Sequence, residues 1–485
     1  MRRNADGRFD SDMMRMVLQK TRAISPRMQR RYAALVTVVL LVGTTQGCGR
    51  REATGPNLVL ISVETLRPDR LACYGGAADV GVGLCALGDA GVRYAWAFST
   101  APSTAPSVAS LLTSRLPRDH DITELATGRL ATEAVTLAET LAAAGYATAA
   151  FVANPVLSRG RDLERGFTVY DDRMQRRERK RPLFEREAKE ITDAALAWVR
   201  AARAPWFLWI HYQDPHGPYE PPDAGLAEDA GDARADAALP VLADQSGWRG
   251  IPAYQVLGEA RDPATYERRY ADEIRYLDRQ IARLVVGLDA YGNRPAILLT
   301  ADHGEAFGED EFWFAHGHSL GVDQIRIPMI WRPAKREPGR VVATPVSNLD
   351  VAPTLLAAAG VPPPASFDGI PLAAREAGPK RAPIFAEHRL RVAVVAGDHY
   401  YARDRVPLPA PVPEPVTGGF VPPLPARSAV LTPDGRFGGY SAVVMAPLEG
   451  LVAAFLAQPA ARGASPQRAV DEQTREALRA LGYLE

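Results

Sequence analysis

The sequence predicts an α/β domain in which helices cover a largely parallel sheet, and two observations carry this prediction. Short apolar runs of the kind found in strands buried on both faces recur along the chain. Apolar residues at helical spacing lie between them, and this alternation is typical of layered α/β folds. The clearest strand-like runs are residues 57–63 (NLVLISV), 206–212 (WFLWIHY), 296–301 (AILLTA) and 325–331 (IRIPMIW).

Two stretches show the helical pattern clearly. In the first, Thr136 and Glu139 form a possible capping box, Gly145 can end the helix, and ATAAFV after it is predicted to be another strand. In the second, residues 270–288, the spacing predicts a helix with one face on the sheet. The apolar residues of that face are Ile274, Leu277, Ile281, Leu284 and Leu288.

Composition limits the possible functions. The chain has 485 residues, of which 47% are hydrophobic, and its 57 basic side chains balance 57 acidic ones. This length allows a large core, and a formal net charge of zero argues against an extended basic surface for nucleic acid. We therefore expect a globular enzyme.

The N-terminal segment differs from the rest of the chain. A basic flank precedes an apolar run at 33–43, which is shorter than the roughly 20 residues that span a bilayer but matches the core of a signal peptide. Gly47 and Cys48 resemble a bacterial lipobox, in which Cys48 becomes the lipidated first residue. We expect residues 1–48 to be a signal peptide for export to the cell envelope, in the periplasm or at the outer membrane, with Met28 as a possible true start. Cleavage without a lipid and an uncleaved anchor are the alternatives.

The other two cysteines are Cys73 and Cys85. They either pair in an oxidising compartment or are two small buried residues. The sequence leaves both interpretations open.

Acidic and histidine side chains follow three of the predicted strands. Glu64 follows the first, Asp214 and His216 follow the second, and Asp302 and His303 follow the third. The carboxyl ends of parallel strands meet at one edge of a sheet, where ligands bind. Because two carboxylates and an imidazole suit a divalent cation, we expect a metal site at that edge.

Six blocks of the sequence carry a resemblance to a known family. They are NLVLISVETLRPDRLACYGG, STAPSTAPSVASLLTSRLPRDHD, FLWIHYQDPHGPYEPP, LLTADHGEAFGE, AHGHSLGVDQIRIPMIW and VSNLDVAPTLLAAAGVPPP. In this order they resemble the sulfatases, a branch of the alkaline phosphatase superfamily. The resemblance implies an α/β/α sandwich, a divalent metal, and nucleophilic attack on a sulfate or phosphate ester. We expect a catalytic domain at 49–395 and a small C-terminal subdomain with a proline-rich connector at 396–485.

The second block bears on the nucleophile. In sulfatases this group is a formylglycine made from Cys or Ser, two residues before the proline of a Cys/Ser-x-Pro-x-Arg motif. Pro106 matches that proline, so the resemblance places Thr104 at the nucleophile position and Val108 at the arginine position. Glu64 likewise stands where most sulfatases have Asp. Threonine is not a known source of formylglycine, so we do not expect formylglycine chemistry.

These departures resemble another branch of the superfamily. Phosphoethanolamine transferases and lipoteichoic acid synthases pair a first-strand Glu with a Thr nucleophile and an Asp-His pair. The metal set that this resemblance implies is Glu64, Thr104, Asp302 and His303. His216 and His316 sit where those enzymes have histidines near the phosphate or a second metal. We expect both to bind ester oxygens or to protonate the leaving group.

The residues themselves also favour Thr104. A hydroxyl is a weak nucleophile near neutral pH unless a metal lowers its pKa. Thr104 precedes a helix that Pro106 can begin, so backbone N–H groups would help to hold an anionic ester. Ser103 and Ser107 are the rival hydroxyls, for which capping and loop hydrogen bonds are the favoured interpretation.

The remaining histidines and the lysines complete the candidate site. His318 is a further candidate, whereas His120 and His211 are expected to be structural. No lysine occurs between Lys189 and Lys335. Histidines or arginines would therefore hold the anion, with the metal neutralising most of the charge.

The sequence thus predicts a metal-dependent hydrolase that cleaves phosphate or sulfate esters through Thr104. Phosphoryl chemistry is favoured over sulfuryl chemistry because the formylglycine precursor is absent. We expect Ca, Mg, Mn or Zn as the metal, an anionic ester as substrate, contact with a membrane through Cys48, and no nucleic acid. Two alternatives stay open: a transferase acting on an envelope lipid or glycan, and an inactive binding protein, which Val108 and the missing lysines would suit.

Overall fold

The computed structural model describes residues 54–124, 128–174, 176–177, 184–222, 238–292, 294–378, 382–413, 418–443 and 445–459. The predicted signal peptide, with Met28 and Cys48, lies outside these residues. Within them, no helix has the length and apolar character needed to cross a membrane.

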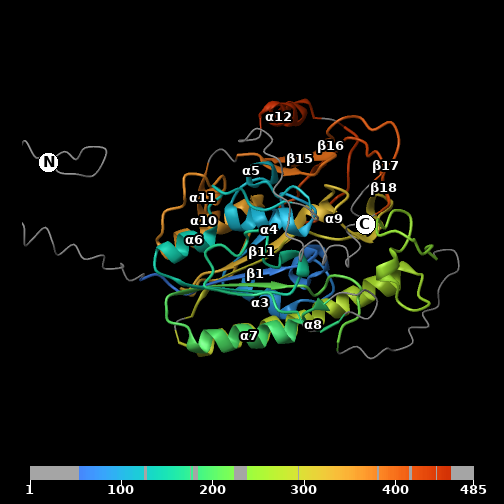
Figure 1. Ribbon diagram of the computed structural model, residues 1–485. Helices are drawn as coiled ribbons and strands as arrows, with labels where there is room; N and C mark the ends of the chain where they lie inside the picture. The colour runs from blue at the N-terminus through green and yellow to red at the C-terminus, as the bar shows by residue number, and fades with distance from the viewer. Residues whose placement is uncertain are drawn as a thin grey trace, which may run out of the picture. The chain divides into compact units, whose positions relative to one another are not determined.

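A large mixed sheet forms the centre of the molecule (Figure 1). Its middle strand β1 (Leu58–Val63) pairs in parallel with β7 (Trp206–Tyr212) and β8 (Ala296–Ala301). β11 (Arg326–Arg332) runs antiparallel between β8 and β2 (Val92–Phe98). The strand order is β12-β2-β11-β8-β1-β7-β3-β4, and β13 also pairs with β2. The outer strands are β3 (Ala147–Val152), β4 (Val169–Asp171), β12 (Arg340–Val342) and β13 (Val346–Ser347).

The four predicted strands are all present, and they are almost completely buried. Continuous apolar sequence is needed because helices cover both faces of the sheet. This confirms the predicted α/β class with a largely parallel sheet. The one difference in direction is β11, which reverses because it follows a connection that returns at the edge from which β8 leaves.

Two helical layers enclose the sheet (Figure 1). One contains α3 (Val82–Asp89), α7 (Ala188–Ala201) and α8 (Pro263–Ala290). The buried face of α8 contains the five apolar residues predicted for it. The opposite layer contains α4 (Thr104–Thr113), α5 (Pro117–His120), α6 (Leu137–Ala143), α10 (Val351–Ala359) and α11 (Leu372–Ala377).

Local signals explain where α6 begins. Thr136 and Glu139 form the predicted capping box, in which the Thr136 hydroxyl accepts from the Glu139 N–H and the Glu139 carboxylate accepts from the Thr136 N–H. Each of these bonds satisfies a backbone or side-chain group that the helix end would leave unpaired.

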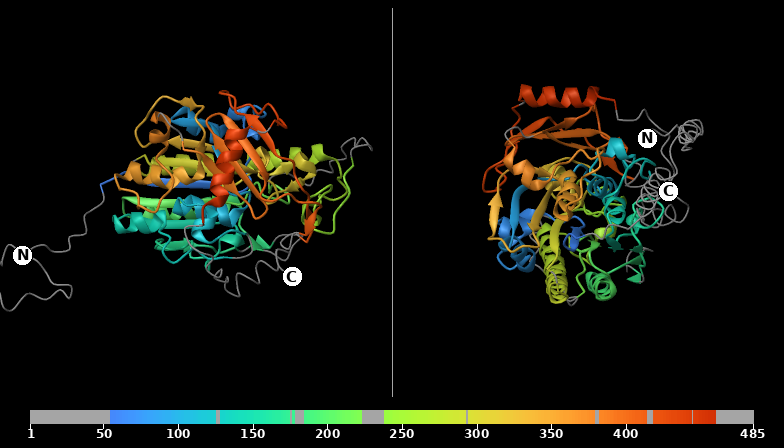
Figure 2. Two further views of the ribbon diagram at one scale, coloured as in Figure 1. Left: turned by 90° about the horizontal axis from the view of Figure 1, so that it is seen from above. Right: turned by 90° about the vertical axis from the view of Figure 1, so that its left-hand side faces the viewer.

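A smaller antiparallel sheet follows in sequence. It contains β14 (Ile384–Glu387), β15 (Arg391–Ala396), β16 (His399–Asp404) and β19 (Arg427–Val430). α12 (Ala446–Ala457) packs on its outer side, as Figure 1 and the right-hand view of Figure 2 show. The proline-rich connector forms a two-stranded sheet from β17 (Val412–Pro413) and β18 (Phe420–Val421).

The expected hairpin after the connector is present. β19 continues into bridges that join Leu431 to Phe437 and Ser428 to Ser441. We call residues 431–440 the C-terminal hairpin.

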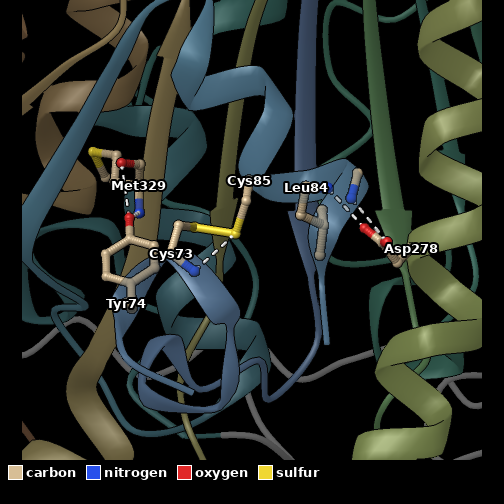
Figure 3. The surroundings of a disulfide bond; sticks show 7 residues. Cys73, Tyr74, Leu84, Cys85, Asp278 and Met329 are labelled. Atoms are coloured by element: carbon tan, nitrogen blue, oxygen red, sulfur yellow. Dashed lines mark hydrogen bonds between the residues drawn. A yellow bond between two sulfur atoms is a disulfide. The ribbon is translucent and has the colours of Figure 1, made fainter. Parts of the chain in front are cut away.

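The two cysteines form a disulfide, which settles the alternative that the sequence left open (Figure 3). Cys73 belongs to a short 3-10 helix after β1, and Cys85 lies in α3. The backbone N–H groups of Gly83 and Leu84 donate to the Asp278 carboxylate of α8 at 2.9 and 2.7 Å. The disulfide therefore ties the segment after β1 to a helix that is itself fixed to α8.

Candidate active site

Four predicted residues meet at the edge of the sheet where β1 and β8 end. Glu64 follows β1, Asp302 and His303 follow β8, and Thr104 is the first residue of α4. All four side chains are buried. The Thr104 hydroxyl lies 2.5 Å from Glu64 Oε1 and 3.3 Å from His303 Nε2.

Helix α4 aims Thr104 at this cluster. Ser103 is the N-cap residue, but its side chain makes no capping hydrogen bond. Ser107, one turn later, donates to the backbone carbonyl of Asp302 at 2.5 Å and accepts from Asn348 Nδ2 at 3.2 Å. Ser107 thus fixes the helix against the loop that carries Asp302, in agreement with the structural role expected for it.

A chain of hydrogen bonds holds Glu64. Trp209 Nε1–H donates to Ser62 Oγ at 2.9 Å, and the Ser62 hydroxyl lies 2.8 Å from His211 Nδ1. Since indole nitrogen only donates, Ser62 is left to donate to Nδ1, and His211 Nε2–H donates to Glu64 Oε2 at 2.8 Å. Asn154 Nδ2 donates to the same oxygen at 2.7 Å.

The pKa of Glu64 reflects these contacts. Burial alone would raise it, but the hydrogen bond and charge of His211, together with His216 and His303, lower it well below its ordinary value. Glu64 is therefore an ionised, buried carboxylate at neutral pH.

Asp302 and His303 complete the cluster. Asp302 Oδ1 accepts from the backbone N–H groups of Thr65 and His303 at 3.1 and 2.7 Å, while Oδ2, although buried, has no hydrogen-bond partner. Burial and the nearby charge of Glu64 raise the pKa of Asp302. His303 Nδ1–H donates to the Gly304 carbonyl at 2.9 Å, which leaves the lone pair on Nε2, the nitrogen that faces Thr104.

This donor set fits a divalent cation. The possible ligand atoms of Glu64, Asp302 and His303 lie within 4.8 Å of one another, and within the described ranges no other group of three such side chains does so. Two buried carboxylates repel each other, and the unpartnered Asp302 oxygen lacks a compensating positive charge. A neutral imidazole with its lone pair directed into the cluster is the form that binds metals. Asp214, which also follows a strand, is not part of this group.

Two further histidines lie beside the cluster. The ring centroids of His303 and His316 are 4.5 Å apart, and those of His316 and His216 are 5.2 Å apart. His316 Nδ1 lies 3.2 Å from Glu305 Oε1, and Tyr219 donates to the other Glu305 oxygen at 3.2 Å. His216 Nδ1–H donates to the Gly217 carbonyl at 2.7 Å. The structure thus brings all six predicted site residues into one region.

Other predicted residues have different surroundings. Val108 is fully buried in the apolar core, where it cannot act as the missing arginine would. His318 stacks on Phe312 with centroids 5.0 Å apart, and burial, with smaller contributions from His316 and Arg391, lowers its pKa to about 3. His120 lies 3.0 Å from Ser110, as a structural histidine would.

Sequence reasoning missed three residues of the site. Asn154 follows β3 at the same sheet edge, so the rule that found Glu64 could have found it. Glu305 lies two residues after His303, but nothing in the sequence connects it to His316. His211 was expected to be structural, and its bond to Glu64 became visible only in the paired strands.

The mixed sheet between two helix layers, with a buried carboxylate and imidazole cluster at the ends of its parallel strands, defines the class: an alkaline-phosphatase-like α/β protein. A family model described as Sulfatase matches residues 56–361. The chain belongs to the sulfatase family.

Individual proteins show the same relationship. A choline-sulfatase of Rhizobium meliloti is 30% identical over 169 residues, which cover 33% of this chain and 32% of that protein. An arylsulfatase of Clostridium perfringens is 30% identical over 183 residues, covering 35% of this chain and 37% of the relative. The matches thus span about a third of the length of these curated relatives. The solved phosphonate monoester hydrolase of Silicibacter pomeroyi shares the fold with a TM-score of 0.57 and 21% identity, covering 77% of this chain and 89% of that one.

Proposed function

We propose that this protein is a metal-dependent hydrolase of phosphate or sulfate esters, with Thr104 as its nucleophile and phosphoryl esters preferred. The observation that carries the proposal is the position of the Thr104 hydroxyl. It is hydrogen-bonded to Glu64 and faces the lone pair of His303, at the first residue of a helix whose N-terminus favours an anion.

The chain's residues suit a two-step displacement. The Thr104 proton passes to the Glu64 carboxylate, to which it is already hydrogen-bonded, and Oγ1 forms a bond to phosphorus or sulfur. The bond from that atom to the leaving oxygen breaks, and His316, oriented by Glu305, donates a proton to the leaving oxygen. Water then attacks the Thr104 ester, which releases phosphate or sulfate and restores the hydroxyl.

Glu64, Asp302, His303 and the Thr104 hydroxyl are the residues that would hold the divalent cation. When bound, such a cation lowers the pKa of a hydroxyl and neutralises negative charge on the ester. Calcium, magnesium, manganese and zinc all accept oxygen and imidazole ligands, so the set does not select one of them.

Two observations favour phosphoryl over sulfuryl transfer. The position that resembles the formylglycine precursor is a threonine, whose hydroxyl is suited to a displacement that leaves a covalent ester. The fold is also shared with a phosphonate monoester hydrolase. The complete arrangement around Thr104 favours an enzyme over an inactive binding protein.

Export to the bacterial cell envelope, with a lipid anchor at Cys48, is part of the proposal. It is supported by the Cys73–Cys85 disulfide, since disulfides persist mainly in oxidising compartments.

The test compares wild type, Thr104→Ala and the matched control Ser103→Ala, each supplied separately with Ca, Mg, Mn and Zn. Turnover of aryl phosphate, aryl phosphodiester and aryl sulfate is measured. We expect the phosphate esters to be cleaved fastest, Thr104→Ala to lose that activity while still binding metal, and Ser103→Ala to keep most of it. Equal activity of wild type and Thr104→Ala would show that another group attacks, and faster sulfate cleavage would reverse the proposed preference.

A further inference from the structure

A second cavity lies apart from the catalytic cluster. Its volume is about 480 Å³, and its walls come from the segment after β1, the residues just before β11, and the C-terminal hairpin. Three aromatic residues, Tyr74, Phe437 and Tyr440, contribute to the wall. None of the six site residues lines it.

Two charged side chains in this wall are not fully hydrogen-bonded. Asp323 is only 7% exposed, and neither of its carboxylate oxygens has a hydrogen-bond partner. Arg326 is 4% exposed; its Nη2 donates to the carbonyls of Ala95 and Gly435 at 2.9 and 2.7 Å, but its Nε–H has no partner. Buried polar groups are seldom left this way, and a ligand is one reason for it.

The surrounding charges, in contrast, are paired. Arg67 forms ion pairs with Asp69 at 2.8 Å and Glu309 at 2.9 Å. Arg427, which stacks over Tyr440, pairs with Asp310. The missing partners are therefore confined to two acceptor oxygens and one donor nitrogen in the same wall.

These groups select a kind of ligand. An ammonium group could satisfy Asp323 but would leave the Arg326 donor unpaired and would face the positive charges of Arg67 and Arg326. An anion could satisfy Arg326 but would face the carboxylates of Asp69, Glu309 and Asp323. A hydroxyl both donates and accepts, and it adds no net charge.

The apolar part of the wall and the size of the cavity agree with this choice. Phe437, with 36% of its surface exposed, offers a ring against which the C–H face of a cyclic polyol can pack. The volume falls within the range of about 300–1,000 Å³ that is usual for small-molecule sites.

We propose that this cavity binds a neutral polyhydroxylated ligand, a single sugar residue, whose hydroxyls donate to Asp323 and accept from Arg326 Nε. The cavity is a binding site separate from the catalytic cluster. It does not depend on the identity of the nucleophile or of the ester.

The experiment titrates the full chain with D-glucose, D-galactose and N-acetyl-D-glucosamine, and in parallel with ethanolamine and acetate. Binding is followed by calorimetry and by the shift in thermal unfolding. We expect at least one sugar to bind saturably and to raise the unfolding temperature, whereas ethanolamine and acetate do not.

Variants connect that binding to the cavity. Asp323→Asn and Phe437→Ala should each weaken sugar binding by about tenfold or more; Phe437 is partly exposed, so its replacement tests the cavity even if Asp323→Asn folds poorly. Val286→Ala, an exposed apolar position on α8, is the matched control. Thr104→Ala should bind sugar as wild type does, which keeps this test independent of catalysis. The proposal is overturned if no sugar binds, if ethanolamine or acetate binds more tightly than every sugar, or if Phe437→Ala binds as well as wild type.

Discussion

Removing the Cys73–Cys85 disulfide should destabilise the protein by an amount that follows from its loop. The two cysteines are 12 residues apart in sequence. Cross-linking a loop of this length removes conformational entropy from the unfolded chain worth about 3 kcal/mol at 25 °C. The Asp278 carboxylate continues to hold the start of α3 in the folded protein. Most of the loss should therefore come from the unfolded state, with the native fold retained.

The assay is denaturant unfolding followed by tryptophan fluorescence, with and without a thiol reductant. The wild type and a Cys73→Ala/Cys85→Ala variant are compared, both also carrying Cys48→Ala so that the third cysteine plays no part. Reduction should lower the free energy of unfolding of the first protein by about 3 kcal/mol and leave the second unchanged. The reasoning is refuted if reduction has no effect on the first protein, or if the variant is as stable as the oxidised parent.

Three further predictions concern the buried charges. Because burial and Glu64 raise the pKa of Asp302, binding of a divalent metal should release a proton from it, detectable as buffer-dependent heat in calorimetry; Asp302→Asn should show no such release. Loss of the His211 bond to Glu64 in His211→Phe should weaken metal binding by roughly 10- to 100-fold with the fold intact, and an unchanged affinity would show that the bond does not position Glu64. Burial, followed by the charges of nearby acidic groups, raises the pKa of Asp323 from 3.8 to about 7, so the folded state holds a proton that the unfolded chain has lost between these values. The free energy of unfolding should consequently fall as pH rises from about 4 to about 7, with a slope of up to about 1.4 kcal/mol per pH unit from this group, and Asp323→Asn should remove that component.

The sheet and most of the site could be predicted because both depend on local patterns. Continuous apolar runs mark strands buried on both faces, and the residue after such a strand lies at the ligand-binding edge. That reasoning reaches Glu64, Asp302 and His303 without knowledge of any contact. Thr104 needed the resemblance to known enzymes as well, because several hydroxyls precede the same helix.

The residues that were missed depend on which strands become neighbours. His211 lies inside an apolar run, where the pattern indicates a core position, and it meets Glu64 because β7 pairs with β1 so that Ser62 stands beside His211. The sugar-binding cavity was also beyond prediction. It forms where the C-terminal hairpin packs against the segment after β1, and the two are separated by more than three hundred positions in sequence.

The reversed strand β11 has a consequence for how such a protein can change over evolution. Because β11 starts at the edge where β8 ends, a single connection leaves that edge and comes back to it. This connection, residues 302–325, carries His316 and its partner Glu305 and, near its far end, Asp323 of the second cavity. An exchange of this one segment between homologues would alter leaving-group chemistry and accessory recognition together, as a cassette, while the strands that carry it remain unchanged.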